Sequence, residues 1–148
     1  MCGIFTLLLS NSSIHIDDIN NYFLKGKKRG PEHSIIKEII KKNIIFGFHR
    51  LAINGLDNLS NQPIESNNNY LICNGEIYNH NEIFKNLCLT RKTNSDCESI
   101  IKGYEKVGCH IVNMLDGVFS FVLYDKKRDQ IMIARDPYGV RPLYICHY

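Results

Sequence analysis

The period of apolar and polar positions changes several times along the first half of the chain. Residues 3–9 form an apolar run of the length expected for a buried strand. Residues 17–26 open with two aspartates and then place apolar side chains at helical spacing, which predicts a helix. Two Ile-rich runs, 34–40 and 43–53, flank the polar pair Lys41-Lys42 and predict a hairpin.

The second half begins with residues 54–69, whose Asn, Ser, Gly and Pro content predicts a surface loop. Residues 70–73 follow as a short strand, and the Asn74-Gly75 pair is typical of a tight turn. Two helices with one apolar face and three strands are then predicted: helices 81–89 and 96–107, and strands 118–124, 130–135 and 142–146. Neighbouring hairpins with grouped helices favour an α+β architecture with antiparallel sheets.

Composition and charge exclude several classes of protein. The 148 residues suit one domain, with 44% hydrophobic and 22% charged residues. No apolar run approaches the roughly 18 residues that cross a bilayer, and the N-terminus lacks the features of a secretory signal. The net charge of +3 is spread along the chain apart from a small basic cluster at 25–29. We therefore expect a cytoplasmic protein that binds neither nucleic acid nor membrane.

The cysteines point to chemistry at the N-terminus. The chain holds six of them, with no CxxC pair and no zinc-ligand spacing, so we expect reduced thiols and no metal. Removal of Met1 leaves Cys2 with a thiol and a free α-amine, whose pKa of about 7.7 to 8.0 suits a base. One residue then supplies both nucleophile and base. Taken alone, a cysteine at position 2 is more often a small buried hydrophobic residue than a nucleophile.

Eight motifs, in order along nearly the whole chain, favour the catalytic interpretation. They are MCGIF at 1–5, RGPEH at 29–33, FGFHRLAI at 46–53, QPI at 62–64, NGEIYNH at 74–80, SDCE at 95–98, LDGVFSFVLYD at 115–125 and ARDPYGVRPLY at 134–144. Together they resemble the glutaminase domain of the asparagine synthetase family, a class II glutamine amidotransferase.

The resemblance implies an N-terminal-nucleophile (Ntn) hydrolase fold, an αββα sandwich of two antiparallel sheets. Family members continue past the position of Tyr148 with further strands and an ATP-dependent synthetase domain. We therefore expect residues 1–148 to be a glutaminase domain, either C-terminally truncated or free-standing, without the synthetase domain. No cofactor is expected in this chain, because ATP and Mg belong to the synthetase domain.

The resemblance also implies roles for individual residues. Cys2 attacks the side-chain amide of L-glutamine and forms a thioester, while the Asn74 amide and the Gly75 N–H form the oxyanion hole. Arg50 holds the α-carboxylate and Asp96 the α-ammonium group. Further pocket positions by resemblance are Leu51, Ala52, Ile53 and Glu76. Without the family pattern, Arg50 is an ordinary surface charge, Asp96 a helix cap and Asn74-Gly75 a plain turn.

Other motif residues are expected to be structural. We interpret His49 as a hydrogen-bonded structural histidine rather than a general base. By resemblance Arg135, Asp136 and Arg141 shape a tight turn or face a partner domain. The ammonia released is expected to pass to a synthetase domain or chain. Two alternatives stay open: a catalytically silent module that binds glutamine or a partner, and an amidotransferase for an acceptor other than aspartate.

Overall fold

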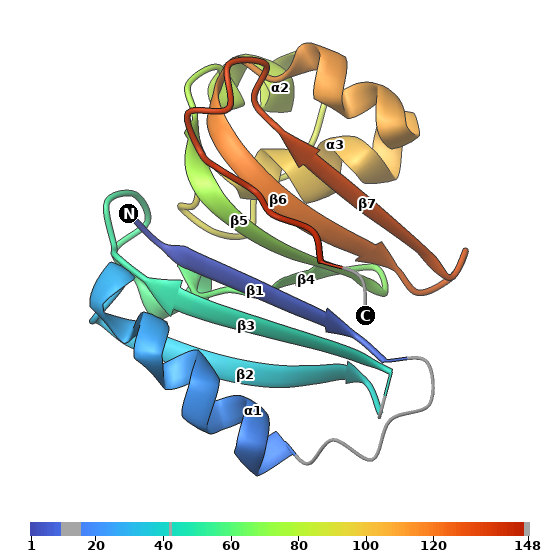
Figure 1. The fold of residues 1–148 in the computed structure, drawn as a ribbon. Helices are drawn as coiled ribbons and strands as arrows, with labels where there is room; N and C mark the ends of the chain where they lie inside the picture. Colours follow the sequence, from blue (N-terminus) through green and yellow to red (C-terminus); the bar gives the residue numbers. More distant parts are fainter. Residues whose placement is uncertain (10–15, 42, 147–148) are drawn as a thin grey trace.

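Two antiparallel sheets stack face to face in the structure, a computed structural model that describes residues 1–9, 16–41 and 43–146. The three-stranded sheet has the order β1 (Gly3–Leu8), β3 (Ile44–Arg50), β2 (His33–Ile40). The four-stranded sheet has the order β4 (Ile64–Ser66), β5 (Asn69–Ile77), β6 (Gly117–Asp125), β7 (Gln130–Arg135). Figure 1 shows the two sheets as adjacent layers.

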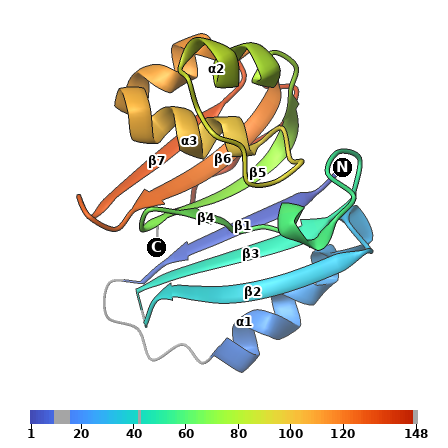
Figure 2. The same cartoon turned by 180° about the vertical axis from the view of Figure 1, so that it is seen from behind.

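Helices cover the outer faces of this pair of sheets, as Figures 1 and 2 show from opposite sides. The three-stranded sheet carries α1 (Ile16–Phe23) and the 3-10 helix η1 (Leu24–Arg29). The four-stranded sheet carries α2 (His80–Asn86), α3 (Glu98–Val107) and the 3-10 helix η3 (Gly108–Met114). A short 3-10 helix, η2 (Asn58–Ser60), lies in the loop after β3. The predicted α+β architecture with antiparallel sheets is confirmed.

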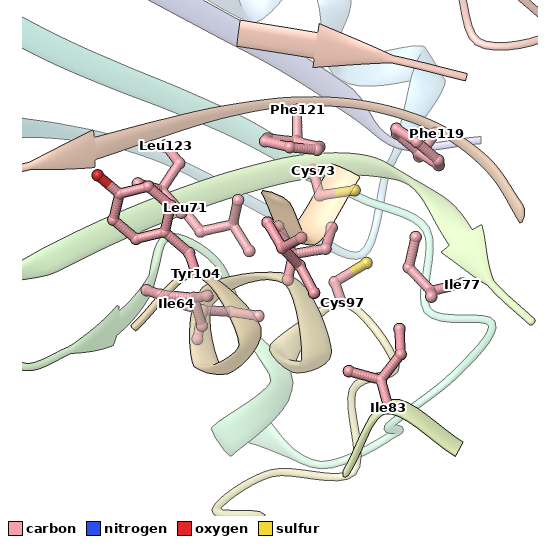
Figure 3. Close-up of a cluster of buried hydrophobic side chains, with 13 residues drawn as sticks. Ile64, Leu71, Cys73, Ile77, Ile83, Cys97, Tyr104, Phe119, Phe121 and Leu123 are labelled. Atoms are coloured by element: carbon pink, nitrogen blue, oxygen red, sulfur yellow. The ribbon is translucent and has the colours of Figure 1, made fainter. Parts of the chain in front are cut away.

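Alternation along the strands divides the interior into two apolar clusters. One lies between the sheets and includes Phe46 and Phe48 from β3 with Ile72 from β5. The other lies between the four-stranded sheet and its helices, where Phe121 and Ile100 are fully buried. Figure 3 shows side chains of this second cluster, drawn from both the strands and α3. Every residue of β3 is buried, because this strand is central in its sheet and covered on both faces.

Several predicted elements are confirmed with small changes of length. The strand at the N-terminus, the hairpin of β2 and β3 and the hairpin of β6 and β7 all form. Strand β3 ends at Arg50 rather than at residue 53, and α1 ends at Phe23, where the chain tightens into η1. The predicted turn residue Lys42 lies outside the described residues, as do residues 10–15.

Three predictions are wrong. The loop predicted over 54–69 contains β4, which pairs with the start of β5. Asn74-Gly75 is not a turn, because β5 continues to Ile77 and pairs with β6 along its whole length. Residues 142–146 form no strand: Pro142 has no N–H to donate, and Tyr144 and Ile145 are 86% and 62% exposed.

Candidate active site

Cys2 lies immediately before β1, and its side chain packs against the cluster between the two sheets. The Leu51 N–H donates to the Cys2 Sγ over 3.3 Å, and the thiol faces the Leu51 carbonyl oxygen at 3.5 Å. Burial raises the pKa of the Cys2 thiol, and the Leu51 backbone contact only partly offsets this. The thiol is therefore held in a fixed position but stays protonated at neutral pH, so it needs a base to become a nucleophile.

Met1 blocks the predicted base, which is the α-amine of Cys2 itself. While Met1 is attached, the Cys2 nitrogen belongs to a peptide bond and cannot accept a proton. Met1 is 47% exposed at the end of the chain, where an aminopeptidase can reach it. Its removal converts the Cys2 nitrogen into an α-amine next to the thiol.

Gly75 lies in β5 where the backbone of β6 comes unusually close. A Cβ on Gly75 would stand 2.3 Å from the Val118 carbonyl oxygen and 2.6 Å from the Phe119 Cα, so only glycine fits. The neighbouring Asn74 is 5% exposed, and its side chain lies on the same face of β5 as Ile72, toward the other sheet. This face is also the one toward which Cys2 packs.

The backbone N–H of Gly75 points away from β6, in the same direction as those of Cys73 and Ile77, because N–H directions alternate along a strand. The Cys73 N–H donates to the Gln62 Oε1 over 2.5 Å, and the Ile77 N–H donates to the Asp96 Oδ2 over 2.6 Å. Among the described residues no acceptor is recorded for the Gly75 N–H that lies between them. This N–H is therefore available to a ligand at the edge of β5.

Arg50 ends β3 and is buried to 7% exposure. Its Nη1 donates to the Asp57 carbonyl oxygen over 3.1 Å and to the Asn61 Oδ1 over 2.6 Å, and its Nη2 donates to the Gly55 carbonyl oxygen. These contacts use three of the five guanidinium N–H groups. Among the described residues no acceptor is recorded for the two others, and two is the number that a bidentate carboxylate requires.

Asp96 precedes α3, and 5% of its surface is exposed. Its Oδ2 accepts the Ile77 N–H, so the carboxylate fixes the end of β5 against the start of α3. This is not a helix cap, because the cap position of α3 is Cys97. Within the described part of the chain, no hydrogen bond to Oδ1 of Asp96 is recorded.

A single pocket brings most of the predicted site residues together. Cys2 borders this pocket, and eight other residues were predicted to bind substrate or take part in catalysis. Seven of these eight also border it: Arg50, Leu51, Ile53, Asn74, Gly75, Glu76 and Asp96. The exception is Ala52, which does not border the pocket and whose N–H donates to the Glu32 side chain. Ala52 lies in the irregular segment after β3, which ends at Arg50.

The pocket is also lined by residues that the sequence did not predict as part of the site. Among its further lining residues are Gln62, Ser60, Ser95, Cys73 and Cys97. Gln62 belongs to the QPI motif without a predicted role, yet its side chain is buried and accepts a hydrogen bond from the backbone N–H of Cys73. Its place inside the QPI motif is the sequence signal that could have identified it.

The remaining motif residues contact other parts of the protein. His49 is buried, with its ring nitrogens 2.7 Å from the Ser34 Oγ and 2.9 Å from the Phe23 carbonyl oxygen, which fits the predicted structural role. Asp136 accepts backbone N–H groups from β6 and from its own turn. Arg141 borders the pocket, where its guanidinium contacts the Met1 sulfur.

Across residues 1–9, 16–41 and 43–146, no group of three His, Cys, Asp or Glu side chains is arranged to hold a metal ion. No helix in them is long and apolar enough to cross a membrane. The six cysteines are all free thiols. Two of them, Cys73 and Cys97, are buried in the apolar cluster of Figure 3 and also line the pocket.

The chain is similar to known proteins over nearly its whole length. The chain is 41% identical to a probable glutamine-hydrolysing asparagine synthetase of Dictyostelium discoideum and 37% identical to asparagine synthetase 1 of Saccharomyces cerevisiae. Each match covers 98% of this chain, but 27% and 26% of the two relatives. The chain thus spans about a quarter of the length of these curated relatives. The family described as "Glutamine amidotransferase domain" matches residues 1–148. The chain therefore belongs to the glutamine amidotransferase domain family.

Proposed function

We propose that this chain hydrolyses L-glutamine to glutamate and ammonia through a γ-glutamyl thioester on Cys2. The observation that supports this best is the convergence of four separate segments on one pocket. They contribute the thiol of Cys2, the guanidinium of Arg50, the Asn74-Gly75 pair and the carboxylate of Asp96. This combination supplies a nucleophile, donors for a developing oxyanion, and opposite charges for an amino acid.

In this proposal the two charged residues orient glutamine. The two N–H groups of Arg50 not used by the loop bind the α-carboxylate, and the loop carbonyls fix the guanidinium beforehand. The Asp96 Oδ1 accepts a hydrogen bond from the α-ammonium group, while Oδ2 stays on Ile77. Binding both α-groups selects free glutamine over a glutamine side chain within a protein.

The chemistry then needs only groups of this chain and water. After Met1 is removed, the α-amine of Cys2 takes the thiol proton, and the thiolate attacks the side-chain carbonyl carbon. The Asn74 amide and the Gly75 N–H stabilise the resulting oxyanion. The C–N bond breaks, the amine proton passes to the leaving nitrogen, and ammonia departs. Water then cleaves the thioester to give glutamate and restores the thiol.

The proposal also includes a fold and a partner. The two stacked sheets flanked by helices are compatible with the Ntn hydrolase fold, in which the nucleophile starts a strand. We assign residues 1–148 as a glutaminase domain and propose a synthetase domain or chain that uses the ammonia to make asparagine from aspartate. The names of the relatives support this acceptor, since both include asparagine synthetase.

Trapping of the thioester tests the proposal. Protein without Met1 is incubated with glutamine and hydroxylamine, which should convert the thioester into γ-glutamyl hydroxamate. We expect hydroxamate and ammonia from the wild type and none from Cys2→Ser, with Cys88→Ser as the matched control because Cys88 is an exposed thiol. Glutamine binding by calorimetry without ammonia release would instead identify a silent binding module.

A further inference from the structure

Ser120 carries a buried hydroxyl group without a visible role. The residue lies in the middle of β6 with none of its surface exposed, and its Oγ has no hydrogen-bond partner among the described residues. An unpaired buried hydroxyl is unfavourable, and native proteins rarely keep one without a reason. Ser120 is therefore a candidate for a contact that forms when the active site is in its working arrangement.

Asn74 is the residue directly opposite Ser120 on the neighbouring strand β5. Opposite residues in an antiparallel pair point to the same face, and their Cβ atoms lie about 4.5 to 5.5 Å apart. Both side chains face the other sheet, as do the adjacent Ile72 and Val122. Rotation of the serine and asparagine side chains brings a hydroxyl and an amide at this separation into hydrogen-bond contact.

Arg135 is the other residue opposite Ser120, across the β6–β7 pair. It is exposed, and its guanidinium lies beside Gly139, where an added Cβ would stand 3.1 Å from Nη1. Asn74 is instead buried to 5% exposure, and no hydrogen bond of its side chain to a described residue is recorded. Of the two neighbours, Asn74 is thus the one that borders the pocket with Cys2 and has no recorded side-chain partner among the described residues.

We propose that Ser120 is a positioning residue that donates its hydroxyl proton to the Asn74 Oδ1. This contact turns the carbonyl of the amide toward β6 and the NH₂ group toward the pocket and Cys2. The opposite orientation would direct the carbonyl dipole at a developing oxyanion and repel it. The catalytic part of this inference rests on the proposed function, whereas the contact between the two side chains does not.

A double-mutant cycle tests the catalytic part. We expect Ser120→Ala to lower kcat for glutamine hydrolysis about three- to tenfold, the effect of one net hydrogen bond, with little change in KM. In an Asn74→Ala background the same substitution should have no further effect on kcat. The matched control is Thr6→Val, which removes the hydroxyl of the second residue with an unpartnered buried Oγ. Equal losses in both backgrounds, or a wild-type kcat in Ser120→Ala, would overturn the proposal.

The contact itself is measured by NMR, independently of activity. The side-chain amide resonances of Asn74 are assigned by their loss in Asn74→Ala. We expect them to shift in Ser120→Ala and to return toward the wild-type position in Ser120→Thr, which keeps the hydroxyl. Unchanged resonances would refute the contact, whether or not the protein hydrolyses glutamine. A shift in a protein that releases no ammonia would refute the proposed function and leave the Ser120–Asn74 contact standing.

Discussion

At Cys2, burial and backbone hydrogen bonding act on the thiol in opposite directions. Burial is the larger effect and raises the thiol pKa above its ordinary value, so the thiolate fraction falls as the pH is lowered. In protein that retains Met1, we therefore expect alkylation of Cys2 by iodoacetamide to slow roughly tenfold per pH unit between about pH 9 and pH 7. The rate is followed by peptide mass spectrometry. A rate that does not depend on pH would contradict a buried, protonated thiol.

The loop after β3 holds the guanidinium of Arg50 in a fixed position. Three loop acceptors hold the guanidinium, and lysine can reproduce neither these contacts nor the bidentate geometry. We expect Arg50→Lys to raise KM for glutamine about ten- to hundredfold, the effect of losing a charge-assisted pair of hydrogen bonds. The exposed Arg91 gives the control Arg91→Lys. An unchanged KM in a variant with wild-type urea stability would exclude carboxylate binding by Arg50.

In strand β5, pairing with a distant strand outweighs the local preference of the sequence for a turn. Asn-Gly favours a turn, but the apolar run of β6 pairs with β5 on both sides of it and keeps the pair in a strand. Glycine is needed there because the carbonyl oxygen of Val118 occupies the place of a Cβ. This close approach depends on the pairing partner more than forty residues away and so leaves no local signal.

Asp136 joins β7, β6 and the following turn through its buried carboxylate. Burial alone would raise the pKa of Asp136, but four backbone N–H groups outweigh burial and lower the pKa. A lowered pKa stabilises the fold above the unfolded pKa of about 3.9, and this stability is lost as the pH falls through the folded pKa.

We therefore expect Asp136→Asn to lower the free energy of unfolding at pH 7 by about 2 to 4 kcal/mol, since the amide presents N–H groups to other N–H groups. Urea denaturation measures the change, and the exposed Asp116 gives the control Asp116→Asn. The difference between wild type and Asp136→Asn should shrink toward pH 3. A difference that grows in acid would show that the carboxylate does not carry this stability.

At the scale of the whole molecule, the two sheets are joined by the cluster that contains Phe46, a side chain with none of its surface exposed. We expect Phe46→Ala to cost about 3 to 5 kcal/mol, the usual penalty for a large cavity, while unfolding stays a single transition. The control Leu8→Ala removes a side chain that is 52% exposed. Separate unfolding of the two sheets in wild type would show that the cluster does not couple them.

Sequence patterns predicted the strands and helices with strong periodicity, and the motif resemblance predicted residues that meet in one pocket. Both kinds of prediction missed residues whose role is set by contacts with segments far away in the sequence. Gln62 enters the pocket because its side chain holds the backbone of β5, and Ser120 lies opposite Asn74 only through strand register. Ala52, although it is inside a motif, does not border the pocket, and its N–H donates to the Glu32 side chain.

If Cys2 is a nucleophile in an assembled glutamine pocket, an electrophilic analogue of glutamine should react with it. The intact mass of the purified protein is measured first, and the protein is then treated with the glutamine analogue 6-diazo-5-oxo-L-norleucine and mapped by peptide mass spectrometry. We predict a mass without Met1 and a single adduct on Cys2, with protection by excess glutamine. An unmodified Cys2 in processed, folded protein, or adducts spread over the exposed cysteines, would contradict the account.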